Sequence, residues 1–148
     1  MSGYHTSRVK VLSRLTTVSS RHVGSGKTHP FTALDHAMGL HSVHVVFYYK
    51  VNVFKDFDLD SPRVSLSDAL SLYPPVTGRV TRNGEGNWEV NCNDAGVRIV
   101  RARVGSSMDE WLRSADGIEE KDLTVWDDMP EDTTNWSPFR IQVRVYIL

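Results

Sequence analysis

The stretch SPRVSLSDALSLYPPVTGRVTR, residues 61–82, decides the class of fold, because a helix, a helix stop and a strand follow one another in it. Ser61 and Pro62 supply an N-cap and a proline at the first helical position. Apolar residues then recur at the spacing of one helical face: Leu66, Ala69, Leu70 and Tyr73. The pair Pro74-Pro75 ends this helix, and a β-branched run begins after Gly78. The stretch therefore predicts an α+β fold.

Three short strands are predicted after the two prolines, at 78–82, 87–92 and 97–104. The turn sequences NGEG and NDAG separate them, and both favour tight reversals of the chain. We therefore expect an antiparallel meander of three strands. Within the third strand the apolar residues change from odd to even positions, which predicts a β-bulge near 99–100.

The last part of the chain is predicted to contain one short helix and one strand. Ser107 and Glu110 have the spacing of a capping box, so a helix begins at 107. An acidic, irregular stretch follows it. From 139 to 148 large apolar residues alternate with polar ones, which predicts a strand with one apolar face.

Upstream of the deciding stretch, the pattern predicts a strand at 8–18, a loop at 19–30 and a short helix at 32–38. Thr32 is the expected N-cap of that helix, and Gly39 is its expected C-cap. Residues 43–49, VHVVFYY, are β-branched or aromatic almost without interruption. Such a run is typical of a central strand that is buried on both faces.

The composition indicates a single domain over 1–148, with a mixed or antiparallel sheet and a few short helices. Of the 148 residues 40% are hydrophobic and 24% are charged, which are ordinary values for a globular protein. Cys92 is the single cysteine, so an internal disulfide is impossible and the reducing cytoplasm is the expected compartment. The longest apolar run, 45–49, is too short to cross a membrane, and the polar N-terminus does not resemble a secretory signal.

Charge is distributed unevenly along the chain. Residues 1–55 carry seven Lys and Arg against one acidic residue, whereas 56–148 carry ten against seventeen. The basic residues stand singly, without the clustering that nucleic-acid binding requires, so no nucleic-acid partner is expected. Residues 109–132 hold ten Asp and Glu, and the simplest interpretation of this stretch is a solvated helix and loop face.

No catalytic or metal site can be identified from the histidines. All six lie in the first 44 residues. His41 and His44 are three apart, which places them on opposite faces of a strand. Asp35 and His36 are adjacent, so their side chains diverge on a helix. We interpret these histidines as structural.

Other chemistry-bearing residues give no stronger signal. Cys92 is expected mid-strand, where it serves core packing rather than nucleophilic catalysis. The carboxylate pairs Glu119-Glu120 and Asp127-Asp128 are neighbours in a solvated stretch that would not separate their pKa values. The run GSGKT at 24–28 has Arg21 where a phosphate-binding loop has its first glycine, and His29-Pro30 follows in place of a helix. No catalytic, cofactor-binding or metal-binding residue is therefore assigned.

Several stretches together resemble the N-terminal part of the plant BAHD-type acyltransferases, also called HXXXD-type. They are TALD at 32–35, FYYK at 47–50, LSDALSLYPPVTGR at 66–79 and CNDAGV at 92–97. Their order and spacing cover nearly the whole chain. LDHAMGLH at 34–41 and NWEV at 87–90 are similar to the eceriferum-like branch of that family.

The resemblance implies a two-domain, chloramphenicol acetyltransferase-like fold, of which this chain would be a truncated first part. It also implies acyl-CoA as the co-substrate of the intact family, with no cofactor bound by this chain itself. The family's general base is the His of a His-x-x-x-Asp motif. In this chain the residues four positions after each His are Val9, Gly26, Ala33, Leu40, Val45 and Tyr48.

Three functions stay open on this basis. The chain is an acyltransferase relative by descent, a non-enzymatic interaction module, or a non-functional fragment. The eceriferum-like branch is linked to very-long-chain fatty acid elongation for cuticular wax, so a fatty-acid condensing enzyme at the endoplasmic reticulum is the partner that the resemblance implies. The alternating strand at 139–148 also predicts self-association or capture of a partner strand, if it lies at a sheet edge.

Overall fold

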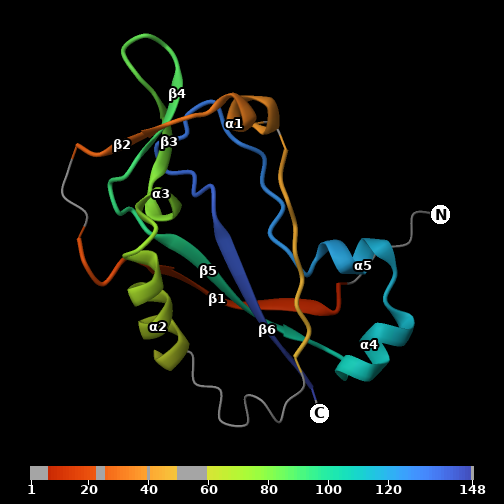
Figure 1. The fold of residues 1–148 in the computed structure, drawn as a ribbon. Helices are drawn as coiled ribbons and strands as arrows, with labels where there is room; N and C mark the ends of the chain where they lie inside the picture. Colours follow the sequence, from red (N-terminus) through yellow and green to blue (C-terminus); the bar gives the residue numbers. More distant parts are fainter. Residues whose placement is uncertain (1–6, 23–25, 40, 50–59, 148) are drawn as a thin grey trace.

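The fold of this computed structural model is built on two small sheets, and residues 7–22, 26–39, 41–49 and 60–147 are described (Figure 1). The strand orders are β1-β5-β6 in the first sheet and β2-β4-β3 in the second. In chain order the strands are β1 (Val9–Thr17), β2 (Thr28–Pro30), β3 (Arg79–Arg82), β4 (Trp88–Asn91), β5 (Val97–Val104) and β6 (Arg140–Tyr146). Together with five short helices in the described ranges, this confirms the predicted α+β class.

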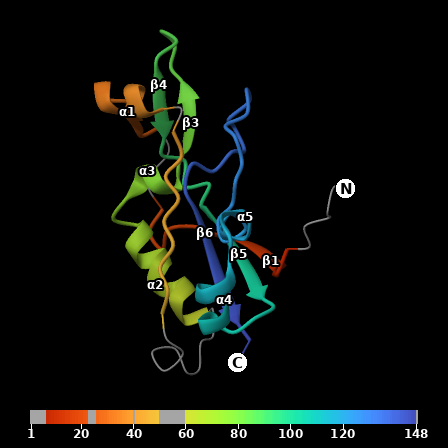
Figure 2. The ribbon, with the colours of Figure 1, turned by 90° about the vertical axis from the view of Figure 1, so that its right-hand side faces the viewer.

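The first sheet is mixed, and a mixed sheet was one of the two predicted alternatives. β1 runs antiparallel to β5, and β6 runs parallel to it. Figure 2 shows β6, β5 and β1 side by side in that order. Val104 of β5 lies between Val9 on one side and Tyr146 on the other. The predicted strands at 8–18 and 139–148 are thus confirmed.

The predicted three-stranded meander is wrong in its last member. β3 and β4 do pair antiparallel, but β5 belongs to the other sheet, between β1 and β6. The reason lies in the turn before β5, where Asp94 and Gly96 adopt positive φ values of 50° and 85°. These residues direct the chain away from β4. The edge of β4 pairs instead with β2, which lies in the segment that we predicted as a loop.

The predicted bulge near 99–100 is also wrong. β5 keeps a continuous register with β6, and the one register shift against β1 falls in β1 itself, between Val11 and Ser13. The apolar residues of β5 move from odd to even sequence positions because the face of the strand that is covered changes along its length. Ile99 and Val100 are consecutive and both buried. A change of covered face and a bulge produce the same sequence pattern.

The helix at 32–38 is confirmed as α1 (Ala33–Met38), with Thr32 as N-cap and Gly39 as C-cap. The second predicted helix is α2 (Asp60–Leu70), which ends before Tyr73. Contrary to prediction, Pro74-Pro75 does not only stop a helix. The two prolines begin another short helix, α3 (Pro74–Thr77), because proline suits the first helical turn.

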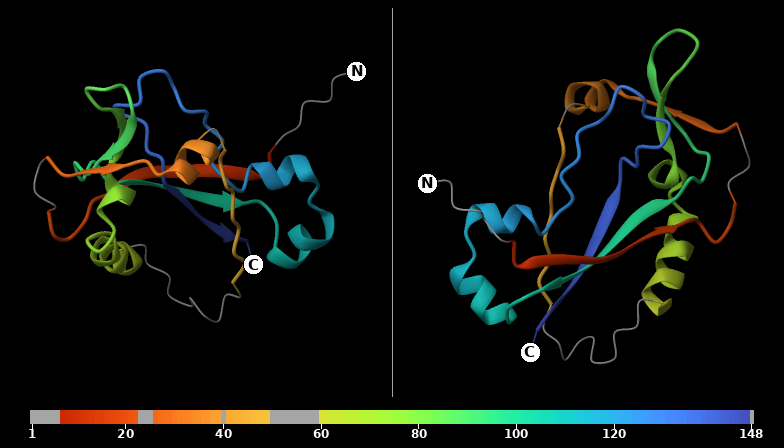
Figure 3. Two further views of the ribbon diagram at one scale, coloured as in Figure 1. Left: turned by 45° about the horizontal axis from the view of Figure 1, so that its top comes forward. Right: turned by 180° about the vertical axis from the view of Figure 1, so that it is seen from behind.

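Two further helices cover the other end of the first sheet. The predicted helix after 107 is α4 (Met108–Ser114), in which Ser107 Oγ accepts a hydrogen bond from the backbone N–H of Glu110. The stretch expected to be irregular contains one more helix, α5 (Gly117–Lys121). Figure 3 shows α4 and α5 at one end of the sheet and α2 at the other. Val104, Trp111 and Leu123 form the buried cluster beneath α4 and α5.

The predicted central strand at 43–49 is wrong. The run crosses the molecule as an extended trace (Figures 1 and 2), but it belongs to neither sheet. Its side chains still alternate: Val43, Val45 and Phe47 are exposed, whereas Val46 packs against the buried cluster. The sequence pattern was that of a strand, but no neighbouring strand in the described part of the chain pairs with it. We call residues 43–49 the extended segment.

Candidate interaction surface

Three of the described histidines, His22, His36 and His44, contact different parts of the chain. His22 Nδ1 lies 3.6 Å from a carboxylate oxygen of Asp94. The ring of His44 stacks on Trp126 with centroids 3.9 Å apart. Nowhere in residues 7–22, 26–39, 41–49 and 60–147 do three or more His, Cys, Asp or Glu side chains gather as a metal site would require.

The side chains of the adjacent residues Asp35 and His36 have different partners. The carboxylate of Asp35 accepts hydrogen bonds from the backbone N–H and the hydroxyl of Thr32, each at 2.7 Å. These bonds hold the pKa of Asp35 below its ordinary value. The ring of His36 instead meets the edge of Phe31, with centroids 5.7 Å apart. Asp35 is therefore engaged in capping α1.

Cys92 is buried, as its predicted packing role requires, although it follows β4 instead of lying within it. Burial raises the pKa of its thiol, which disfavours the reactive thiolate. Of the GSGKT run, residues 24 and 25 lie outside the described residues. Thr28 begins β2, so a strand stands where a phosphate-binding loop needs a helix.

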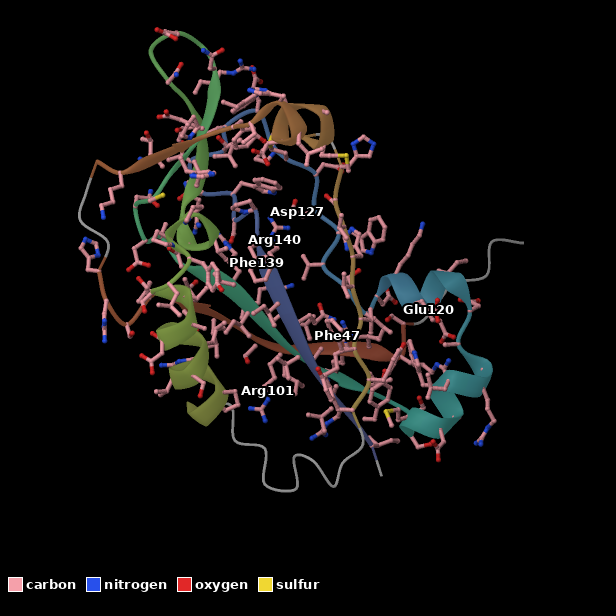
Figure 4. All side chains as sticks on the ribbon, in the orientation of Figure 1. Phe47, Arg101, Glu120, Asp127, Phe139 and Arg140 are labelled. Atoms are coloured by element: carbon pink, nitrogen blue, oxygen red, sulfur yellow. The ribbon has the colours of Figure 1, made fainter. Side chains whose placement is uncertain are left out.

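One carboxylate of each sequence pair binds an arginine that comes from a distant part of the chain. Both carboxylate oxygens of Glu119 accept hydrogen bonds from Arg8, at 2.5 and 2.6 Å, and the same guanidinium lies 4.7 Å from the ring centre of Trp111. Asp127 pairs with Arg140 of β6 at 2.6 Å (Figure 4). Sequence reasoning missed these partners, because contacts between residues far apart in sequence leave no local pattern.

The passage YPPVTGR proves to be a structural joint rather than a reactive site. Arg79 is buried, and its guanidinium donates to the backbone carbonyls of Gly78, Gly96 and Ala95 at 2.8, 3.0 and 3.1 Å. At Gly78 a Cβ would lie 2.5 Å from the carbonyl oxygen of Asn91, so only glycine lets the two backbones approach. These contacts hold the start of β3 against the turn before β5.

A cavity of about 330 Å³ lies between the first sheet and the segment after α5. Its lining includes Val9, Val100, Gln142 and Thr124, and it contains neither histidine nor cysteine. Asp122 and Arg14 are the charged residues of this lining.

Exposed apolar side chains stand out on β6 and on the extended segment. Val145 of β6 is 47% exposed, and Val43 and Phe47 are 79% and 73% exposed. Figure 4 shows Phe47 on the extended segment and Phe139 at the start of β6. The apolar face predicted for the last strand is thus real, and it is incompletely covered. We call these residues, together with Phe139 and Ile147, the apolar strip.

The extended segment meets β6 through tyrosine rings. The ring centroids of Tyr48 and Tyr146 are 6.5 Å apart. Burial, and next the neighbouring Tyr48, raise the pKa of Tyr146 to about 12. Burial also lowers the pKa of Arg144 on the same strand. The polar residues of β6 thus lie on its covered face, while part of its apolar face is open.

With the geometry established, comparison with known proteins identifies the family. The sequence profile described as "Transferase family" matches residues 7–146. "Protein ECERIFERUM 26-like" of Arabidopsis thaliana is 33% identical over 111 residues, covering 74% of this chain and 26% of its own length. "Protein ECERIFERUM 26" of the same plant is 31% identical over 104 residues, covering 70% and 24%. This chain therefore matches about a quarter of the length of these relatives.

A solved structure shares the fold. The crystal structure of vinorine synthase superimposes with a TM-score of 0.65 at 19% sequence identity, over 93% of this chain and 35% of that one. In the described residues no helix is long and apolar enough to cross a membrane. The profile match, the curated relatives and the fold agree, and this chain belongs to the Transferase family of BAHD acyltransferases, with eceriferum proteins among its relatives.

Proposed function

We propose that this chain is a non-catalytic, eceriferum-like member of the family, which serves very-long-chain fatty acid elongation as an interaction module. The observation that carries the proposal is the absence, within these 148 residues, of any His with Asp four positions later. A general base typically contributes about 10²- to 10⁴-fold to such a reaction.

The described histidines support this interpretation by their surroundings. His22 lies at Asp94, His36 lies against Phe31, and His44 stacks on Trp126. None of these three lines the cavity under the segment after α5. Acyl-CoA is accordingly proposed as a co-substrate of longer family members and not as a ligand of this chain.

The partner that we propose is a fatty-acid condensing enzyme at the face of the endoplasmic reticulum. The apolar strip supports this proposal, because large apolar side chains that stay exposed, as on β6 and on the extended segment, are a common feature of binding sites. Membership among proteins that include two eceriferum relatives favours elongation over the other chemistries of the family.

Two assays test the proposal. In the first, the purified chain is incubated with acyl-CoA and a simple alcohol, and release of free CoA is followed with a thiol reagent. We expect the rate to equal that of buffer. Turnover clearly above the buffer rate would instead make the chain an acyltransferase.

In the second assay the tagged chain is co-expressed with a condensing enzyme, and the two are co-purified after detergent extraction. We expect the enzyme in the eluate, and we expect its amount to fall when Phe47 is replaced by Lys. Leu34, which is 70% exposed on α1, provides the matched control, since Leu34→Lys leaves the apolar strip intact. No co-purification together with no turnover would indicate a non-functional fragment.

A further inference from the structure

The turn between β3 and β4 projects from the body of the molecule and carries the sequence NGEG at 83–86 (Figures 1 and 3). Residues 84–87 are exposed. Two backbone hydrogen bonds close the turn. The N–H of Asn83 donates to the carbonyl of Asn87, and the N–H of Gly86 donates to the carbonyl of Asn83, each at 2.9 Å. Asn83 is thus held in a defined backbone geometry at a site that water reaches.

The side-chain carbonyl of Asn83 is bound by two backbone donors. The N–H groups of Glu85 and Asn87 donate to its Oδ1 at 3.0 and 2.9 Å. Two backbone N–H groups on one carbonyl oxygen are the arrangement of an oxyanion hole, which stabilises the negative charge that develops on the oxygen when a nucleophile adds to the carbon. The carboxamide carbon of Asn83 is therefore polarised towards attack.

The main-chain nitrogen of Gly84 is the nucleophile next to that carbon. The N–H groups of the next three residues all donate hydrogen bonds, but no acceptor in the described part of the chain binds the N–H of Gly84. A Cβ at residue 84 would have no atom within 4 Å, so the surroundings of Gly84 are open. Glycine also changes its backbone dihedrals at low steric cost, which lets its nitrogen turn towards the side chain of Asn83.

We propose that Asn83 is a site of self-catalysed modification, in which Gly84 closes a succinimide ring on the Asn83 side chain. The main-chain nitrogen of Gly84 loses its proton to hydroxide and forms a bond to Cγ of Asn83, and the negative charge passes to Oδ1 between its two N–H donors. The bond from Cγ to Nδ2 then breaks, and Nδ2 takes up a proton from water and leaves as ammonia. Water hydrolyses the ring at one of its two carbonyls, which gives either aspartate or isoaspartate at residue 83.

The two products differ in their effect on the turn. Aspartate leaves the main chain unchanged, and its carboxylate accepts the same two N–H bonds with the added strength of an ionised acceptor. Isoaspartate adds one carbon to the main chain between residues 83 and 84, so the hydrogen bonds between Asn83 and Asn87 no longer fit. We expect isoaspartate to loosen the end of β3, where the guanidinium carbon of Arg82 lies 4.1 Å from the ring centre of Trp88.

Comparison of the folded with the unfolded chain tests the proposal without any substitution. The purified chain is incubated at mildly alkaline pH in buffer and in urea. Peptide mass spectrometry with electron-transfer fragmentation then follows the conversion of each asparagine and separates aspartate from isoaspartate. We expect Asn83 to react several-fold faster in the folded chain, because only there do two N–H groups hold Oδ1. Equal or faster reaction in urea would overturn the inference.

Two comparisons within the folded chain separate the turn from its surroundings. Oδ1 of Asn93 accepts the N–H of Ala95 at 3.2 Å, but Asp94 follows Asn93 in place of glycine, so we expect Asn93 to react several-fold more slowly than Asn83. Gly84→Ala is expected to stay folded by circular dichroism, because a Cβ fits there, and to slow the reaction several-fold, because the methyl group hinders the nitrogen. Conversion of Asn93 as fast as Asn83, or an unchanged rate in folded Gly84→Ala, would contradict the proposed ring closure.

Discussion

Replacing Gly78 by alanine provides a quantitative test of the close approach between the start of β3 and the end of β4. Gly78 has a φ of −79° and a ψ of −171°, a conformation that alanine adopts without strain. The cost therefore comes from packing alone. The added Cβ would lie 2.5 Å from the carbonyl oxygen of Asn91 and 2.6 Å from Cγ1 of Val90, and the first of these neighbours is backbone.

Overpacking of this kind typically costs about 1–3 kcal/mol, whereas the loss of glycine's freedom in the unfolded chain returns about 0.4–1 kcal/mol. We therefore expect Gly78→Ala to lower the free energy of unfolding by about 1–2 kcal/mol. Urea denaturation followed by circular dichroism measures it as a lower midpoint at an unchanged m value.

Gly84 supplies the matched control, because a Cβ there meets nothing within 4 Å. Gly84→Ala is expected to leave the midpoint within experimental error or to raise it slightly. If Gly78→Ala and Gly84→Ala unfolded at the same urea concentration, the close approach of β3 and β4 at this joint would be refuted.

Three further outcomes are expected. The pKa of Tyr146, raised to about 12, favours the neutral phenol in the folded state. The stability that this adds is complete below the ordinary tyrosine pKa and is lost as pH rises towards 12. In alkaline denaturation we expect Tyr146→Phe to lack that loss and Tyr73→Phe, at an exposed site, to retain it. Burial raises the pKa of Asp94, but hydrogen bonds from Ser19, Thr77 and His22 outweigh burial and leave that pKa lowered. Ionised Asp94 therefore stabilises the fold above its unfolded pKa, and this stabilisation is lost as pH falls through the folded pKa. We expect Asp94→Asn to make the free energy of unfolding less dependent on acid pH, and an unchanged acid transition would contradict this expectation. Arg8→Ala removes both hydrogen bonds to Glu119, which link the start of β1 to α5. We expect a lower melting temperature than that of the unmodified chain at low salt and a smaller difference at high salt. Equal melting temperatures at low salt would show that this ion pair contributes nothing to stability.

Local elements of this fold could be predicted because their signals are local. Thr32 and Ser107 cap their helices as expected, since a cap depends on residues within one turn. The alternation from 139 onwards identified β6, including the exposure of part of its apolar face. The family resemblance, which rests on short motifs in a fixed order, is confirmed by the profile match over residues 7–146.

Pairing between strands could not be predicted from the same patterns. The extended segment has the composition of a buried strand, but whether such a run joins a sheet depends on a neighbour that its own residues do not specify. The meander failed for the same reason, because Asp94 and Gly96 fit a hairpin turn and a departure from the sheet equally well. The arginine partners of Glu119 and Asp127 likewise arise from the fold and not from sequence neighbours.

The measurement that tests the central proposal most directly is the acyl-chain distribution made by a condensing enzyme with and without this chain, in microsomes from cells that co-express the two. We predict that the chain changes the distribution of product lengths, although it releases no CoA by itself. Phe47→Lys is expected to abolish the change, and Leu34→Lys is expected to preserve it. Identical product distributions with and without the folded chain would contradict the account.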